Sequence, residues 1–481
     1  MNIRNAVGLV GAVLMALDAS AGTYYASPDG TGSGAQGDPC SLMDAVTKVN
    51  ADKGGEIVLA TGTYQEAEDV TGTRNYDTFD SGSSWLYSYY CLKDYPIVIR
   101  SASGKPEDVI IKGRRADNKE IRLFRIAGDQ VTIRDVTLSG ALESVRGGSA
   151  VFCVTANCGT VLDNCIIEDC LAPAGVLYRC NLRNSTVRGN VSPQLIYNCP
   201  VSNCTFAANY ANARSATCVY GTKDYSVYDS TFLCNTNCGA GNPLDSGLVR
   251  GVSNVVRCAF IGNYIDNNRH ARGCFSVANV IDCGFTNNIG GSSTVWNGGL
   301  VADCSFLEGP CASVVKNSDT AEHIVSNCMF TASRTSANYT GIVLGNAGTS
   351  VYDSTFESCT NSSALSGYPR AVAIYTANKV MGCRIDGCYS IGGYLIQYVN
   401  SVVNCRFENN LSGSSGWIGG NSSGCVITNC LFMGNCNTSG YTWNGLDNVT
   451  ELVNCTLAGN TMTKMLPIAS GTVRNSILVG N

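Results

Sequence analysis

Two aspartates have a spacing that would suit acid–base chemistry. Asp282 and Asp303 each directly precede a cysteine in successive copies of a repeated motif. If the copies stack, the two carboxylates lie near the ~5 Å separation of a retaining glycosidase pair. The same position holds Asn or Asp in most copies, and mixing the two relieves repulsion between stacked like charges. A structural turn is therefore the favoured interpretation, and catalysis at this pair is the weaker alternative.

Aromatic residues are concentrated in a long insertion at residues 64–95. Such rings form surfaces that stack on sugars or anchor a protein partner. The alternative is a small core of their own that covers the first coil. Two later tryptophans precede their motif cysteines by 13 and 12 residues and form a second, weaker candidate surface. The candidate ligand-binding residues are Trp85, Tyr87, Tyr89, Tyr90, Trp417 and Trp443.

Metal and cofactor chemistry has little support in the sequence. The two histidines, His270 and His323, lie far apart, and no C-x-x-C spacing occurs. We therefore expect no metal and no cofactor. The net charge of -5 also argues against a nucleic-acid partner. The expected partner is a polysaccharide or a cell-surface protein.

One repeat must position these residues. The motif V-x-[ND]-[CS]-x-F-x-x-N recurs from about residue 131 onward, about every 24 residues. The valine and the cysteine are three positions apart, so a straight strand cannot bury both side chains. A left-handed bend at the Asn or Asp between them can. Apolar pairs upstream, such as Leu195-Ile196, add a third strand. The sequence therefore predicts an all-β, single-stranded right-handed parallel β-helix of about 15 or more coils.

The 26 cysteines resemble a disulfide scaffold in number, but such scaffolds are usually small. Ten of them occupy the cysteine position of the motif, where Ser or Val stands in other copies. That interchange predicts a buried column of thiols that pack as small hydrophobes. Three pairs remain disulfide candidates, two because they share an offset on successive coils and one because it would staple the N-terminal end. These pairs are Cys180–Cys199, Cys359–Cys388 and Cys40–Cys91.

The repeats resemble those of known β-helix families. The F-x-x-N half after a cysteine, as in VSNCTFAAN (201–209), is similar to the repeat of chlamydial polymorphic outer-membrane proteins, which are surface-displayed autotransporter passengers. Their companion glycine-rich half is mostly missing here. The first coils resemble the start of pectate-lyase-like proteins, through DPCSLMDAVTKVN (38–50) and GGEIVLATGTY (54–64). That second resemblance implies a short N-terminal cap helix and a fold that hosts polysaccharide lyases and hydrolases.

The ends of the chain predict its organisation and location. Residues 1–21 have the basic start, apolar run and small-residue end of a secretory signal peptide. No later stretch is long and apolar enough to span a membrane. We divide the remainder into an N-terminal cap with the first coils (22–130) and the repeats (131–481). The chain stops on a complete motif, which predicts either a continuation or a docking surface at its C-terminal end.

Together these features predict an exported, non-catalytic surface or adhesion-type protein that presents loops for glycan or protein binding. It would be secreted, or displayed on the outer membrane or cell surface. The alternative is a polysaccharide lyase or glycoside hydrolase of the pectate-lyase-like fold. Segments typical of pectate lyases or polygalacturonases, such as N-T-D and G-H-G, do not occur.

Overall fold

The computed structural model of the protein describes most of the chain after the expected signal peptide. Residues 1–21 lie outside the described part, so the signal peptide stays a prediction. The described residues are 22–66, 73–79, 82–113, 121–142, 147–155, 159–211, 217–237, 247–265, 271–309, 311–317, 319, 321–335, 341–361, 371–413, 416–437, 445–461 and 471–480.

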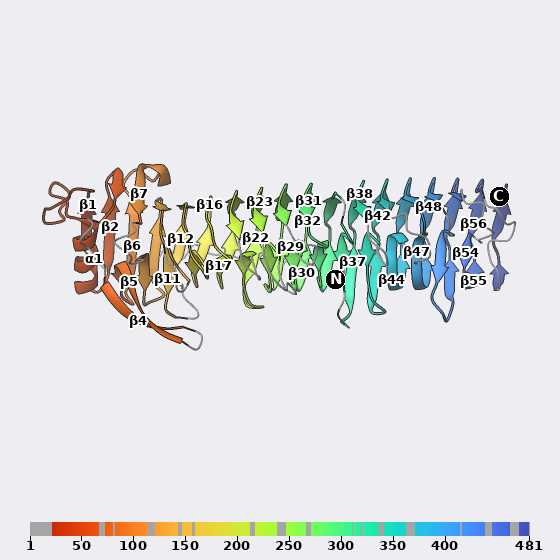
Figure 1. The fold of residues 1–481 in the computed structure, drawn as a ribbon, viewed down its shortest axis with the longest axis horizontal. Helices are drawn as coiled ribbons and strands as arrows, with labels where there is room; N and C mark the ends of the chain where they lie inside the picture. Colours follow the sequence, from red (N-terminus) through yellow and green to blue (C-terminus); the bar gives the residue numbers. More distant parts are fainter. Residues whose placement is uncertain are drawn as a thin grey trace.

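The protein is an all-β, right-handed parallel β-solenoid with almost no helix (Figure 1). Each coil contributes short strands to separate parallel sheets, and the strands of successive coils pair in register along the rod. This confirms the predicted fold class. No helix in the described part of the chain is long and apolar enough to cross a membrane.

The first sheet, here called the phenylalanine sheet, carries the motif phenylalanines. Its strands are β3 (Gly62–Tyr64), β7 (Val109–Lys112), β10 (Thr137–Ser139), β13 (Ile166–Glu168), β16 (Thr186–Arg188), β19 (Thr205–Ala207), β23 (Thr231–Leu233), β27 (Ala259–Ile261), β31 (Gly284–Thr286), β35 (Ser305–Leu307), β38 (Met329–Thr331), β42 (Thr355–Glu357), β45 (Arg384–Asp386), β48 (Arg406–Glu408), β52 (Leu431–Met433), β56 (Thr456–Ala458) and β58 (Ile477–Val479).

The second sheet, the valine sheet, lies before the motif bend. Its strands are β1 (Thr23–Ala26), β2 (Gly55–Leu59), β6 (Ile97–Ser101), β9 (Val131–Arg134), β12 (Val161–Asp163), β15 (Asn181–Arg183), β18 (Val201–Ser202), β22 (Ser226–Tyr228), β26 (Asn254–Val256), β30 (Asn279–Ile281), β34 (Leu300–Ala302), β37 (His323–Ser326), β41 (Thr349–Tyr352), β51 (Cys425–Thr428), β55 (Val449–Val453) and β57 (Thr472–Arg474).

The third sheet, the ridge sheet, carries the upstream apolar pairs. Two long strands, β44 (Ala371–Met381) and β47 (Tyr394–Val403), extend from it into the valine sheet. Its other strands are β5 (Gly82–Leu92), β8 (Ile121–Ile126), β11 (Val151–Cys153), β14 (Leu177–Tyr178), β17 (Gln194–Tyr197), β21 (Thr217–Tyr220), β25 (Val249–Arg250), β29 (Ala271–Phe275), β33 (Ser293–Trp296), β36 (Val315–Lys316), β40 (Val343–Leu344), β50 (Ile418–Gly420) and β54 (Leu446–Asp447).

Smaller elements complete the coils. The strand β4 (Thr73–Phe79) pairs antiparallel with β5, which places the aromatic insertion on a β-hairpin. Two groups of two-residue strands follow the phenylalanine sheet. They are β20 (Tyr210–Ala211), β24 (Thr236–Asn237), β28 (Tyr264–Ile265) and β32 (Ile289–Gly290), and β39 (Arg334–Thr335), β43 (Thr360–Asn361), β46 (Tyr389–Ser390), β49 (Leu411–Ser412) and β53 (Cys436–Asn437).

The bend between the valine and phenylalanine sheets has the predicted left-handed backbone. Asn203 has a φ of 51° and Asp282 one of 54°. Because Asn and Asp tolerate this conformation better than other L-residues with a Cβ, they occupy the position in most coils. The bend lets the valine before it and the cysteine after it both point into the core, as Val201 and Cys204 do.

Stacked phenylalanines fill the core behind the phenylalanine sheet. Ring centroids of Phe206, Phe232 and Phe260 are 4.8 and 4.7 Å apart, and the ring planes differ by only 5° and 3°. The stack continues through Phe285, Phe306, Phe330 and Phe356 at 4.8 to 4.9 Å. Such near-parallel rings mean that successive coils are related by translation with little twist.

The asparagine at the last position of the motif forms a buried ladder of hydrogen bonds from coil to coil. Asn235 Nδ2 donates to Asn263 Oδ1 at 3.0 Å and to the Phe206 carbonyl at 2.9 Å. Each such amide therefore satisfies its own donors and a strand carbonyl of the coil before it. The same pattern links Asn190, Asn209, Asn235, Asn263 and Asn288, and again Asn410, Asn435 and Asn460.

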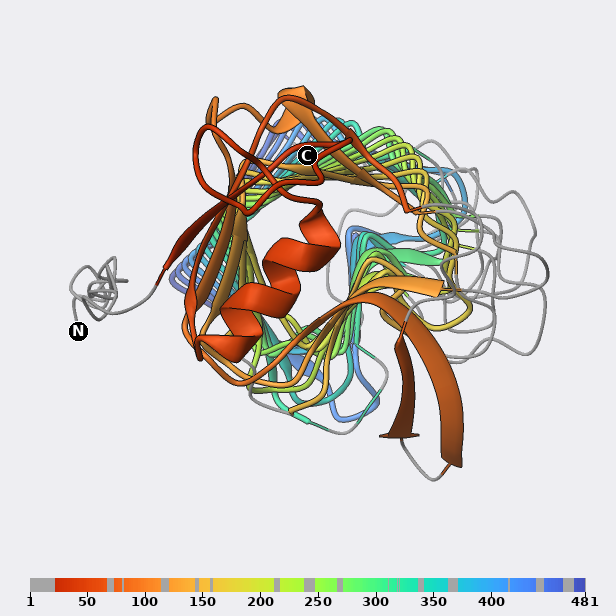
Figure 2. The same ribbon diagram turned by 90° about the vertical axis from the view of Figure 1, so that its left-hand side faces the viewer.

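One α-helix, α1 (Leu42–Ala51), lies across the N-terminal end of the solenoid (Figure 2). Ser41 is its N-cap and accepts a hydrogen bond from the Asp44 N–H. The helix buries Leu42, Val46 and Val49 against the first coils. A single turn of 3-10 helix, η2 (Pro106–Asp108), precedes β7.

The motif cysteines form the predicted buried column. Cys199, Cys359, Cys388 and Cys40 are free thiols in this structure, so none of the three candidate pairs is bonded here, and their pairing stays a prediction. Cys180 Sγ and Cys199 Sγ lie 3.7 Å apart in a thiol hydrogen bond, far beyond a bond of about 2.05 Å. Stacking brings equivalent cysteines together as expected, but the packing of thiols fills the core without a covalent link.

Candidate functional site

An outward-facing column of aromatic and cationic side chains runs along the ridge sheet. Because side chains alternate between faces, the buried Val219 and Val249 point inward and the residues that follow them point outward. Strand register aligns these outward positions from coil to coil. The column, here called the aromatic ridge, comprises Arg125, Phe152, Tyr178, Tyr197, Tyr220, Arg250, Phe275, Trp296, Lys316, Leu344 and Tyr375.

The first rings of the ridge stack face to face. Phe152 and Tyr178 lie 5.0 Å apart with planes at 15°, and Tyr178 and Tyr197 lie 4.8 Å apart at 13°. Tyr220 continues the stack at 5.1 Å. Phe152 and Tyr178 are buried, whereas Tyr197 and Tyr220 are half-buried. The two outer tyrosines therefore present ring surface to solvent on a rigid base.

Cations alternate with rings farther along the ridge. Arg250 Cζ lies 5.3 Å from the Tyr220 ring centre and 5.8 Å from that of Phe275. Lys316 Nζ lies 3.6 Å over the Trp296 ring, and burial lowers the pKa of the Lys316 ammonium. These are cation–π contacts. The aligned positions from Arg125 to Tyr375 include three cations, Arg125, Arg250 and Lys316, and no carboxylate.

A tyrosine, Tyr394, covers the positions that follow the aromatic ridge toward the C-terminus. Tyr394 Oη donates to Asp447 Oδ2 at 2.8 Å, two coils farther along. Its ring lies over Gly419, where an added Cβ would come within 3.2 Å of the ring atoms. Tyr375 and Tyr398 meet edge to face at 5.3 Å just before this point.

Sequence reasoning missed the ridge, although a signal for it exists. The ridge residue is the one that follows the upstream apolar pair, as Tyr197 follows Leu195-Ile196 and Arg250 follows Leu248-Val249. The apolar pairs themselves are visible in the sequence, and aligning the coils on them would have revealed the column of Phe, Tyr, Trp, Arg and Lys.

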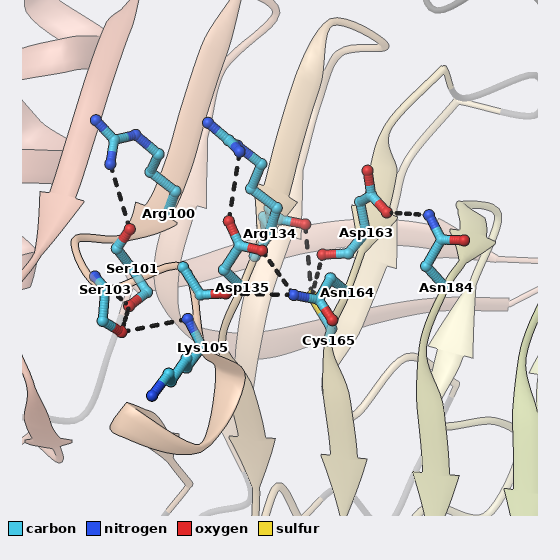
Figure 3. Close-up of polar contacts among 12 residues, drawn as sticks. Arg100, Ser101, Ser103, Lys105, Arg134, Asp135, Asp163, Asn164, Cys165 and Asn184 are labelled. Carbon is cyan, nitrogen blue, oxygen red and sulfur yellow. Dashed lines mark hydrogen bonds and ion pairs between the residues drawn. The ribbon is translucent and has the colours of Figure 1, made fainter.

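A second polar cluster lies on the outside of the first coils of the valine sheet (Figure 3). Register places Arg100, Arg134, Asp163 and Arg183 in one outward column. Arg134 Nη1 lies 3.4 Å from Asp135 Oδ2, and Arg183 Nη2 lies 2.8 Å from Asp163 Oδ2. This cluster, here called the polar strip, gathers acidic and basic groups on one face.

Amides fix the carboxylates of the polar strip. Asn164 Nδ2 donates to Asp135 Oδ1 at 2.8 Å, and Asn184 Nδ2 donates to Asp163 Oδ1 at 2.7 Å. Arg100 Nε in turn contacts Glu56 Oε1 at 2.6 Å, and this pairing raises the pKa of the Arg100 guanidinium. Half-exposed arginines beside fixed carboxylates can hydrogen-bond sugar hydroxyls or carboxylates.

The structure places Asp282 and Asp303 on adjacent coils, as the sequence predicts. Both have left-handed backbones and exposed side chains. Asp303 Oδ1 accepts a hydrogen bond from Asn327 Nδ2 at 2.5 Å, which fits the turn-forming interpretation. Their participation in catalysis stays a hypothesis. Within the described ranges, no group of three or more His, Cys, Asp or Glu is arranged to hold a metal ion.

Three of the predicted aromatic ligand residues have buried rings, and their role in ligand binding stays a prediction. Tyr89 and Tyr90 pack in the core, and Tyr90 Oη donates to Glu66 Oε1 at 2.7 Å. Trp417 is completely buried and stacks on Phe432 at 6.0 Å. The burial of Tyr89 and Tyr90 agrees with the alternative that the rings of the insertion cover the first coils. The side chains of Trp85 and Tyr87, and all of Trp443, lie outside the described part of the structure.

No protein-family model and no curated protein sequence match the chain. Solved structures do match it, and 58 chains do so. A rhamnogalacturonan lyase is 14% identical over 76% of this chain and 82% of its own, with a TM-score of 0.28. A pectate lyase is 13% identical over 94% of this chain and 78% of its own, with a TM-score of 0.21.

A double mutant of the tailspike protein of E. coli bacteriophage HK620 is 12% identical over 95% of this chain and 78% of its own, with a TM-score of 0.31. These proteins are what the chain is similar to in overall fold. The sheet topology makes the chain a right-handed parallel β-helix, and the likeness carries no argument about its activity.

Proposed function

We propose that the protein is an exported, non-catalytic surface or adhesion-type β-helix protein that binds glycan along the aromatic ridge. The observation that carries the proposal is the column of outward positions on the ridge sheet from Arg125 to Lys316, which are all rings or cations and of which Tyr197, Tyr220 and Trp296 are half-buried. Aromatic faces offer large, rigid, amphipathic contact area to sugar rings. Coils repeat about every 4.8 Å, so the ridge presents rings and cations at regular intervals to a chain laid along the rod.

The location in this proposal is supported by the sequence. The signal-peptide pattern at residues 1–21 accounts for export. The similarity of the repeats to chlamydial outer-membrane passengers supports display on a cell surface. We also propose that the rod comprises about 15 or more coils and that α1 caps its N-terminal end, since stacked strands run from β3 to β58 and α1 covers the first coils.

Glycan binding tests the proposal. Purified protein is screened on an array of neutral and acidic glycans, and hits are measured by calorimetry. Trp296→Ala and Tyr197→Ala remove half-buried ridge rings and should weaken binding more than tenfold, because each removes a stacking surface. Tyr228→Ala is the matched control, since Tyr228 is an exposed tyrosine on the valine sheet, away from the ridge. Absence of binding to every glycan, or equal losses in all three variants, would refute the proposal.

The second candidate function is a polysaccharide lyase or glycoside hydrolase, and the polar strip is the observation that favours it. Incubation with uronic-acid and neutral polysaccharides would then release unsaturated or reducing ends. Asp135→Asn, which keeps the shape of the side chain, should abolish that release if the strip is catalytic. Asp282→Asn and Asp303→Asn test the pair identified in the sequence. Binding without turnover would favour the non-catalytic function.

A further inference from the structure

The cations of the aromatic ridge are few and unevenly spaced. Strand register aligns Arg250, Phe275, Trp296 and Lys316 on successive coils. Arg250 and Lys316 are therefore three coils apart, which is about 14 Å at the strand spacing of a sheet. Between Arg250 and Arg125, nearer the N-terminus, the ridge holds only rings. A ligand laid along the ridge thus meets a positive charge at some coils and an aromatic ring at the coils between them.

Lys316 has no anionic partner in the part of the chain that the structure describes. Its Nζ lies 3.6 Å from the centre of the Trp296 ring, and its side chain is half-buried. Burial alone lowers the pKa of its ammonium, because the charged form has lost part of its water. A partly desolvated cation gains most from an anionic hydrogen-bond acceptor. The protein therefore presents a positive charge that a ligand can neutralise.

The rings between the cations disfavour negative charge. The face of an aromatic ring carries the negative part of its quadrupole, so it attracts cations and repels anions. Tyr197, Tyr220 and Trp296 are half-buried and present part of their ring surface to solvent. The C–H groups of a sugar ring suit these faces, whereas a carboxylate over them would lose water without gaining a partner. The ring positions therefore favour neutral sugars.

We propose that the ridge binds an acidic heteropolysaccharide in which neutral sugars separate the anionic ones. This inference rests on the proposed binding of glycan along the ridge and names the class of glycan. A pyranose ring in an extended chain is about as long as the spacing between coils, so neighbouring sugars lie on neighbouring coils. Anionic sugars contact Arg250 and Lys316, and neutral sugars lie over the two coils between them and on the rings of Tyr197 and Tyr220.

A uniformly charged polysaccharide does not fit this pattern. It offers an anion at every coil, or at every second coil where neighbouring sugars face opposite sides. Either arrangement, once it meets Arg250, also places an anion over the Trp296 ring two coils farther along. A neutral polysaccharide suits the rings but leaves Lys316 without an anion. The spacing of the cations therefore favours one charge density of the ligand as well as one sign of charge.

Calorimetry with polysaccharides of different charge density tests the class. The probes are gellan and xanthan, in which neutral sugars separate the glucuronates, together with polygalacturonate, alginate and neutral dextran. The purified protein should bind a sparsely charged probe about tenfold more tightly than any other, the gain of a hydrogen bond to a charged group. Tightest binding of polygalacturonate, alginate or dextran would overturn the inference and leave glycan binding intact. Binding of no glycan, among these or on the array, would refute the proposed function and this inference with it.

Substitution of Lys316 separates the role of charge from that of shape. Lys316→Met keeps an apolar stem over Trp296 and should weaken binding of the tightest sparsely charged probe about tenfold. The same probe with its carboxylates reduced to alcohols should bind equally to the variant and to the unmodified protein. Lys379→Met is the matched control, because Lys379 is a half-buried lysine where β44 runs in the valine sheet.

Circular dichroism checks that both variants keep the fold. Equal losses for the probe and its reduced form would mean that Lys316 acts by packing, and an equal loss in Lys379→Met would mean that the effect is not local. Either result would refute Lys316 as the contact for an anionic sugar.

Discussion

At the residue scale, the cysteine position of the motif places a small, uncharged thiol or hydroxyl in the interior of each coil. Cys165 and Cys170 are completely buried, and each thiol donates to backbone carbonyls of its own coil and the coil before. Burial raises the pKa of both thiols to about 12. Serine replaces cysteine at Ser185 and Ser230, and its hydroxyl donates to a carbonyl in the same way.

These thiols predict a loss of stability in alkali. In the unfolded chain a thiol releases its proton near pH 8.5, whereas in the folded chain it stays protonated until about pH 12. Below pH 8.5 both states are protonated and the stability is fully present. Above it, the free energy of unfolding should fall by up to about 1.4 kcal/mol per thiol for each pH unit.

Urea unfolding at pH 7.5 and 10.5 measures this effect. Cys165→Ser and Cys170→Ser should reduce the pH dependence, because serine does not titrate in this range, while keeping the hydrogen bonds seen at Ser185. A free energy of unfolding that is the same at both pH values would contradict the burial of neutral thiols.

At the element scale, the phenylalanine rings stack at the spacing that strand hydrogen bonding gives to successive coils. Phe285 lies between Phe260 at 4.8 Å and Phe306 at 4.9 Å. The chain itself varies this position, since Ile385 and Leu457 occupy it in other coils and are also completely buried. A branched aliphatic side chain therefore fits the same space without the stacking contact.

Truncation of Phe285 should be costly, and aliphatic replacement much less so. Phe285→Ala leaves a cavity and should lower the free energy of unfolding by about 3–5 kcal/mol. Phe285→Leu should cost less than half of this, as the natural Leu457 indicates. Chemical denaturation of both variants gives the comparison. Equal costs would mean that the stack contributes through ring contacts alone and not through filled volume.

At the scale of the whole molecule, a solenoid buries its core only between neighbouring coils. Its ends therefore need cover. At the N-terminal end, Ala45, Val46 and Val49 of α1 pack against the first coils, which is the contact expected of the cap that we propose. Thr47 lies on the opposite, exposed side of the same helix.

A charge on the buried side of α1 should loosen the N-terminal coils first. Val46→Asp buries a carboxylate without a partner and should destabilise the protein by at least about 3 kcal/mol. Thr47→Asp, on the exposed side, is the control and should change little. Hydrogen exchange should show the loss of protection concentrated in β2, β3 and β6. Uniform loss along the whole rod would mean that the coils unfold as one unit rather than by neighbour contacts.

Much of the fold follows from local rules that a sequence displays directly. Alternation along strands predicts which of Val201, Cys204 and Phe206 point inward, and all three are buried. The left-handed preference of Asn and Asp predicts the bend at Asn203. Both rules act within a few residues, so each copy of the motif reports them independently. The placement of Asp282 and Asp303 on adjacent coils was predictable because they occupy equivalent positions in successive copies of the repeat.

Tertiary structure alone decided which aromatic rings are buried in the core and which align from coil to coil in the aromatic ridge. Tyr89, Tyr90 and Trp417 belong to the core, because burial depends on what packs over a side chain rather than on its type. The aromatic ridge exists only because register brings residues about 20 to 30 positions apart, such as Tyr220, Arg250 and Phe275, into one column. The sequence by itself determined the coil, and the stacking of coils determined the surfaces on which function depends.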